Sequence, residues 1–150
     1  MDIASAGREL IRIGVGGQDY CVSVAAVREI RGWTPATPIP GAPDYIVGVI
    51  NLRGLVLPIL DLRVRLGAEA AEPGARSAVV VCEIHGRTIG LLVDAVSDIL
   101  TVTAEQLQPT PEVARAGEDL IDGVLAMDGW MAGLLSLERV VPDLEFAEAA

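Results

Sequence analysis

Three aspartates are the side chains in this sequence that could take part in acid–base catalysis or bind a metal ion. Asp94 and Asp98 lie in one short segment, and Asp61 ends an apolar run. Two carboxylates that converge in a pocket can act as general acid and general base, and a larger group of acids can bind a divalent cation. Small and branched apolar residues separate these acids, which favours turn and helix-cap roles. A small barrel enzyme using Asp94 with Asp98, or Asp61 with a neighbour, is the alternative.

Nucleophilic chemistry has little support elsewhere in the chain. His85 is the only histidine, and no serine or cysteine can be placed beside it from local spacing. Cys21 and Cys82 each lie inside an apolar run, which predicts two reduced, buried thiols rather than a metal site or a redox pair. The chain also has no lysine. We therefore expect a protein that is not an enzyme and that needs no cofactor and no metal.

Arg53 has the most distinctive setting of the charged residues. It stands with Gly54 between two apolar, β-branched runs, residues 46–52 and 55–60, which together predict a β-hairpin with Arg53 at its exposed tip. Because these strands do not alternate polar and apolar residues, both of their faces need to be covered by the fold or by another protein. A guanidinium at such a tip is a planar five-donor fork that suits carboxylates or carbonyls of a partner.

The sequence pattern predicts a fold of short strands joined by tight turns. Strand–turn–strand patterns recur at residues 9–24, 46–60, 77–93 and 120–135. Three-residue spacing of Val24, Val27 and Ile30 predicts one or two helical turns over residues 24–30. Further helical turns are expected at residues 62–66, capped by Asp61, and at residues 136–141. The pattern predicts an all-β barrel or a pair of small barrels.

The composition and the apolar runs argue against several classes of function. The formal net charge of -10 repels phosphate backbones, so nucleic-acid binding is not expected. No apolar run approaches the length that spans a bilayer, and the N-terminus has no secretory signal, which predicts a cytoplasmic protein without direct membrane insertion. Two Trp, two Tyr and one Phe are too few for a small-ligand-binding barrel with an aromatic-lined cavity.

Five short strings occur in order along the chain. They are Val27-Arg28-Glu29-Ile30-Arg31-Gly32, Gly48-Val49-Ile50-Asn51-Leu52-Arg53-Gly54, Pro58-Ile59-Leu60-Asp61-Leu62-Arg63, Gly90-Leu91-Leu92-Val93-Asp94 and Val96-Ser97-Asp98-Ile99-Leu100. Over residues 9–141 this arrangement resembles the CheW family of chemotaxis coupling proteins. The resemblance implies an all-β fold of two SH3-like five-stranded β-barrels packed side by side with short helical turns. It also implies one CheW-like domain at residues 8–145, between flexible termini at 1–7 and 146–150.

The same resemblance implies a function and a site. The function is that of a non-catalytic adaptor, which joins the cytoplasmic hairpin tip of methyl-accepting chemoreceptors to the regulatory domain of the histidine kinase CheA in membrane-anchored receptor arrays. A groove between the barrels would receive the receptor, while the barrel ends would dock on CheA. A pilus or gliding-motility pathway is an equally compatible setting. The matching positions for receptor or kinase binding are Val27, Glu29, Arg53, Gly54, Val96 and Ile99.

Overall fold

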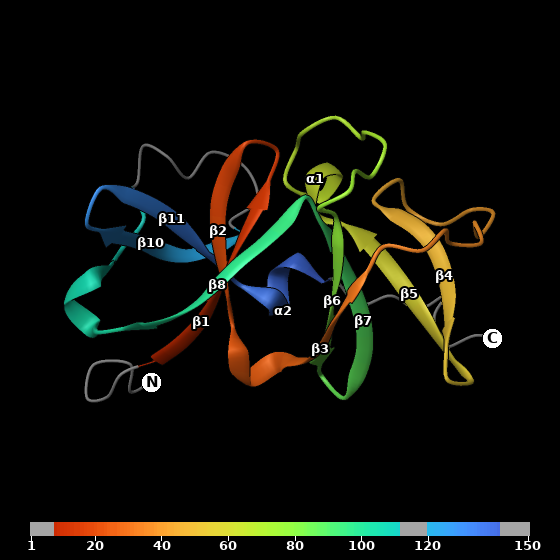
Figure 1. Ribbon diagram of the computed structural model, residues 1–150, viewed down its shortest axis with the longest axis horizontal. Helices are drawn as coiled ribbons and strands as arrows, with labels where there is room; N and C mark the ends of the chain where they lie inside the picture. Colours follow the sequence, from red (N-terminus) through yellow and green to blue (C-terminus); the bar gives the residue numbers. More distant parts are fainter. Residues whose placement is uncertain (1–7, 112–119, 142–150) are drawn as a thin grey trace.

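The computed structural model describes residues 8–111 and 120–141, and β-strands dominate both segments (Figure 1). One group of strands comprises β1 (Arg8–Val15), β2 (Gln18–Ser23), β8 (Ala95–Val102), β9 (Leu107–Gln108), β10 (Ile121–Met127) and β11 (Trp130–Leu135). The other comprises β3 (Val27–Gly32), β4 (Ile46–Leu52), β5 (Leu55–Asp61), β6 (Ala78–Ile84) and β7 (Arg87–Val93). The helical turns are η2 (Val24–Ala26), α1 (Leu62–Arg65), η3 (Ala104–Gln106) and α2 (Leu137–Val140).

These strands form two sheets that lie side by side in Figure 1, with α2 between them. The first sheet has the order β8-β1-β2-β11-β10-β9, and the second has the order β3-β6-β7-β5-β4. All four hairpins expected from the sequence are present as antiparallel pairs. The all-β, two-barrel prediction is confirmed. The two-residue strand β9 brings the first sheet to six strands where five were expected.

The helix expected at residues 24–30 is wrong beyond its first turn. Only Val24–Ala26 is helical, and the following residues form β3, which pairs with β6. Valine and isoleucine also favour strands, and pairing with a neighbour outweighs a weak three-residue spacing. The shorter helical turns are confirmed: Asp61 caps α1 by accepting a hydrogen bond from the Arg63 backbone N–H at 2.9 Å, and α2 follows Ser136.

The buried side chains form three groups, one within each sheet and one shared between them. The first sheet encloses Leu10, Cys21, Val102, Leu125, Ala132 and Leu134. The second sheet encloses Leu52, Leu57, Ile59, Val79, Val81 and Leu92. A larger shared core lies between the sheets and includes Ile11, Ile13, Val80, Leu91 and Val140. Because both sheets contribute to the shared core, each barrel buries apolar area that it would expose alone.

The second sheet curls so that its two edge strands, β3 and β4, come together. Beyond the end of β3, Thr37 forms an isolated bridge with Val49 of β4. The Thr37 N–H donates to the Val49 carbonyl at 2.8 Å, and the Val49 N–H donates to the Thr37 carbonyl at 2.9 Å. These bonds close one end of the barrel. The termini expected to be flexible, 1–7 and 146–150, lie outside the described residues.

Candidate functional site

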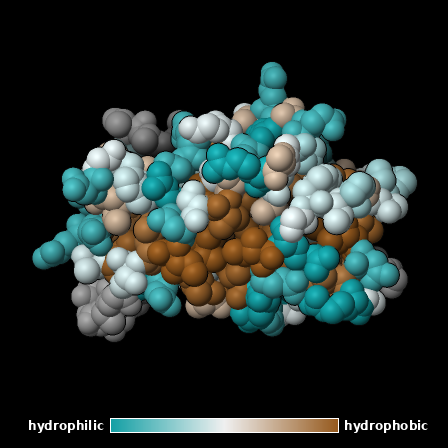
Figure 2. All heavy atoms as spheres, in the orientation of Figure 1, coloured by the Kyte–Doolittle hydropathy of each residue, from teal (hydrophilic) through white to brown (hydrophobic). Residues whose placement is uncertain are grey.

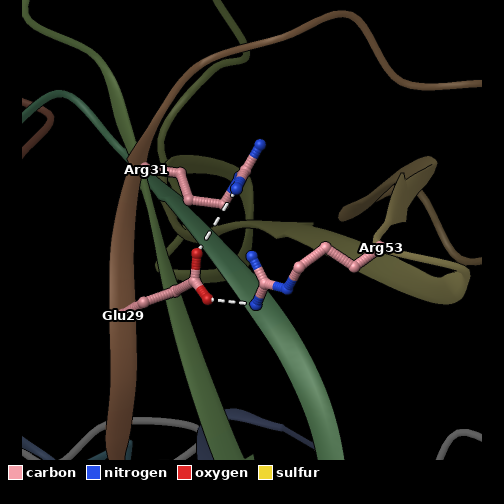
Figure 3. Close-up of polar contacts among 3 residues, drawn as sticks. All are labelled: Glu29, Arg31 and Arg53. Atoms are coloured by element: carbon pink, nitrogen blue, oxygen red, sulfur yellow. Dashed lines mark hydrogen bonds and ion pairs between the residues drawn. The ribbon is translucent and has the colours of Figure 1, made fainter.

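Glu29 and Arg53 meet across the seam where the second sheet closes. Glu29 lies on the edge strand β3, and Arg53 lies at the tip of the β4–β5 hairpin at the other edge. Arg53 Nη2 donates to Glu29 Oε1 at 2.6 Å, while Arg31 Nη1 donates to Glu29 Oε2 at 3.3 Å (Figure 3). One carboxylate therefore holds two guanidiniums in place, and the cluster keeps a net positive charge.

Hydrogen bonding stabilises the ionised forms of Glu29 and Arg53. The pKa of Glu29 is lowered from its ordinary 4.5, chiefly by the hydrogen bond from Arg53, with a further contribution from Arg31. The same bond raises the pKa of Arg53. Both groups therefore stay ionised at neutral pH. The Glu29 side chain is half-buried and is engaged by both arginines.

The Arg53-Gly54 turn displays its arginine to solvent, as the sequence predicted. Both residues have positive φ, 53° at Arg53 and 88° at Gly54, and the Gly54 N–H donates to the Asn51 side chain at 2.8 Å. The Arg53 side chain is 68% exposed, and Glu29 engages only its Nη2. The guanidinium of Arg53 therefore lies largely in solvent.

Val27 and Val96 approach the shared core from opposite sheets. Val27 begins β3, and Val96 lies on β8, the edge strand of the first sheet, where it pairs with Ile13. Both side chains are half-buried against the shared core. Ile99, further along β8, is 63% exposed. We call Val27, Val96 and Ile99 the apolar strip.

Apolar residues also gather on one face of the molecule as a whole (Figure 2). Figure 2 shows apolar residues gathered across the middle of this face, over the region that β8 crosses in Figure 1. Large exposed apolar residues that gather on one face indicate an interaction surface more strongly than single ones do. Gly54 lies beside a hollow of about 500 Å³ that Thr37, Val49 and Val56 also line. The structure thus brings together Glu29 and Arg53, and it packs Val27 and Val96 against the same shared core.

Arg31 is the contact that sequence reasoning missed. It lies two residues from Glu29, and alternate residues of a strand point to the same face. Residues 27–32 alternate between half-buried and exposed, as expected for a strand with one covered face. The signal was present in the sequence, but the interpretation of this segment as helical concealed it.

The carboxylates are engaged in structural contacts. Asp61 caps α1, and Asp94 accepts a hydrogen bond from the Gly16 N–H at 2.7 Å and pairs with Arg63. Asp98 is exposed on β8. Within residues 8–111 and 120–141, no group of three or more His, Cys, Asp or Glu side chains is placed to hold a metal ion. The paired-carboxylate enzyme is therefore not favoured.

The two cysteines and the histidine are the other side chains with reactive groups. Cys21 and Cys82 are free and buried, as predicted, and burial raises the pKa of their thiols to about 11 and about 12. His85 is exposed in the β6–β7 turn with a φ of 55°. None of the helices in the described segments has the length and apolar character needed to cross a membrane.

Comparison with known proteins identifies the family. Residues 9–145 match the family described as the CheW-like domain. The chain is 55% identical to the chemotaxis protein CheW of Rhizobium meliloti, over 95% of this chain and 93% of that one. It is 35% identical to CheW of Klebsiella aerogenes, over 95% of this chain and 87% of that one. The crystal structure of the scaffolding protein TtCheW from Thermoanaerobacter tengcongensis matches with a TM-score of 0.83 and 27% identity, covering 89% of this chain and 92% of that one. The fold, the shared motifs and these relatives agree, and the chain belongs to the CheW family of chemotaxis adaptor proteins.

Proposed function

We propose that this chain is a non-catalytic adaptor that couples the cytoplasmic hairpin tip of methyl-accepting chemoreceptors to the regulatory domain of a CheA-type histidine kinase. In this proposal the chain resides in the cytoplasm, at arrays of membrane-anchored receptors. Residues 8–145 act as one CheW-like unit made of two barrels. No step of covalent chemistry is assigned to it.

The observation that carries the proposal is the apolar strip together with an exposed guanidinium: Val27 of the strip lies two residues along β3 from Glu29, the carboxylate that Arg53 contacts. Val96 and Ile99 on β8, with Val27 on β3, offer apolar contacts to the buried face of a helical hairpin. Amphipathic helices dock in this way, with apolar anchors at the centre and charged residues at the rim. Arg53 and Glu29 supply that rim and set orientation, because charge complementarity contributes more to specificity than to raw affinity. Gly54 allows the positive φ that the tip requires.

A binding experiment with separate partners tests the function. The purified chain is titrated with a receptor fragment that contains the cytoplasmic hairpin tip, and independently with the regulatory domain of the kinase. We expect saturable binding to each, and a ternary complex when both are present. A folded chain that binds neither partner contradicts the proposal. Co-purification from native cells then identifies the receptor and distinguishes a flagellar chemotaxis pathway from a pilus or gliding pathway.

A further inference from the structure

The four-residue helix α1 carries two arginines that reach out of the second barrel. Arg63 pairs with Asp94, which stands where the chain passes from β7 in the second sheet to β8 in the first. Asp94 in turn accepts from the Gly16 N–H in the β1–β2 turn at 2.7 Å. The Asp94 N–H donates to the Gly14 carbonyl at 2.9 Å. Arg63 is thus linked through one carboxylate to the first hairpin of the first barrel.

Arg65 makes the second connection, to the helix that follows the last strand of the first sheet. Its Nε donates to the Val140 carbonyl and its Nη2 to the Arg139 carbonyl, both at 2.8 Å. These carbonyls belong to the C-terminal end of α2, where carbonyls lack partners within the helix and a cation is stabilising. On its own side, the Arg65 guanidinium lies 5.1 Å from the centre of the Tyr45 ring, which precedes β4. Arg65 therefore bridges the second barrel and α2.

We propose that Arg63 and Arg65 are positioning residues that fix the placement of one barrel relative to the other, and so set the spacing of Val27 and Val96. These two valines meet the shared core from opposite sheets, so any sliding or opening of the barrels changes the distance between them. Apolar contacts across the close-packed shared core hold the two sheets together, but they are non-directional and do not pair specific polar atoms across the junction. Charge-assisted hydrogen bonds have a fixed geometry and resist such sliding. The consequence for binding rests on the proposed function.

Distances between spin labels on the two barrels test the inference directly. Met131 on β11 and Val56 on β5 are 64% and 63% exposed, and each is replaced by cysteine to carry a label. The native Cys21 and Cys82 are buried with raised pKa values, so they stay unlabelled in the folded protein. Arg63→Met and Arg65→Met remove the donors while keeping an unbranched apolar side chain. Arg12→Met is the matched control, because Arg12 pairs with Asp19 inside the first sheet.

We expect one narrow distance distribution for the parent and for Arg12→Met, and a broader or shifted one for Arg63→Met, Arg65→Met and the double variant. Affinity for the receptor tip falls roughly tenfold in the double variant. Affinity for the kinase domain, which engages a barrel end, stays unchanged. Arg65→Lys keeps the charge but loses the two-donor fork, and it serves as the milder variant if the methionine variants do not fold.

Two results overturn the proposal. The first is a distance distribution in the folded double variant that matches the parent; Arg65→Lys replaces the double variant in this comparison if the double variant does not fold. The second is a changed distance distribution with unchanged affinity for the receptor tip. A failure of the proposed function can be distinguished from both of these results. If the parent itself binds no receptor tip, the label distances still decide whether the two arginines position the barrels.

Discussion

Arg53 and Glu29 are 24 residues apart in sequence and lie on the two edges of one sheet, yet their side chains meet at 2.6 Å and close the seam between β3 and the β4–β5 hairpin. The contact holds Arg53 in one orientation while 68% of its side chain stays in solvent. A pair in this position has two separable roles, closing the seam and presenting charge. The first prediction separates them.

Arg53→Glu is expected to leave the fold intact and to weaken partner binding about tenfold or more, because it replaces the guanidinium of the proposed interface by a negative charge. Far-UV circular dichroism and thermal unfolding report the fold, and titration with the receptor tip and with the kinase domain reports binding. The matched control is His85→Glu, at the tip of the β6–β7 hairpin, where the turn also has positive φ at both residues. Unchanged binding of both partners by folded Arg53→Glu contradicts the role given to Arg53.

The ionisation of Glu29 gives a second prediction. Its pKa in the folded protein lies below its ordinary 4.5, and Arg53 is the largest cause. A lowered folded-state pKa contributes stability that is present above the unfolded value and is lost as the pH falls through the folded value. Carbon-detected NMR titration of the carboxyl group should show a midpoint below 4.5 in the parent. Arg53→Met should raise that midpoint more than Arg31→Met does, because the Arg31 hydrogen bond is longer. Equal shifts in both variants would refute this ranking.

Gly48, the first residue of the string that ends at Arg53-Gly54, has no room for a side chain. Its φ is 152°, and a Cβ built there would lie 2.2 Å from the Thr37 carbonyl oxygen. That oxygen belongs to the bridge that closes the barrel, so it cannot move without breaking the bridge. Gly48→Ala should lower the free energy of unfolding by about 1–3 kcal/mol, the usual cost of overpacking, or by more if the bridge breaks.

Urea unfolding measures this cost against a glycine without the crowding. At Gly74, an added Cβ meets nothing within 4 Å, and φ is not in the left-handed region. Gly74→Ala should therefore change the free energy of unfolding by less than about 0.5 kcal/mol. If both alanine variants unfold at the same urea concentration, the close approach between residue 48 and the Thr37 carbonyl is not the reason for a glycine at this position.

The hairpins could be predicted from sequence because their determinants are local. Each needs only two apolar runs and a turn residue that accepts positive φ, such as Gly54 or Gly86. The strand β3 escaped prediction because three spaced apolar residues resemble a helical face, and only its pairing with β6 shows which structure forms. The parallel pairings of β5 with β7 and of β2 with β11 join segments distant in sequence, and no local pattern marks them.

Most of the candidate site residues were proposed only through resemblance. The hairpin pattern identified Arg53 as an exposed guanidinium, but nothing local places Glu29 beside it or Val27 and Val96 on one core. The contacts of Arg65 are even harder to predict from local sequence, since its Nε donates to a carbonyl 75 residues away. Such contacts depend on how the two sheets pack, which follows from the summed burial of the shared core rather than from any short motif.

The shared core should make the two barrels unfold together. Each barrel has one tryptophan near its own core: Trp130 packs against the core of the first sheet and Trp33 against that of the second. Trp33→Phe and Trp130→Phe therefore leave one fluorescent reporter for each barrel. Their urea midpoints should coincide, because neither sheet can keep the shared core buried after the other unfolds.

A cavity placed in one barrel tests this coupling most sharply. Leu125 is fully buried in the core of the first sheet, and Leu125→Ala should cost about 2–5 kcal/mol of unfolding free energy. In the Trp130→Phe background, the remaining reporter, Trp33, lies in the other barrel and touches none of the altered core. In the Leu125→Ala variant, the urea midpoint reported by Trp33 should nevertheless fall by as much as the midpoint that Trp130 reports in the Trp33→Phe background. If Trp33 keeps its original midpoint while Trp130 shifts, the barrels unfold independently, and the shared core does not unite them.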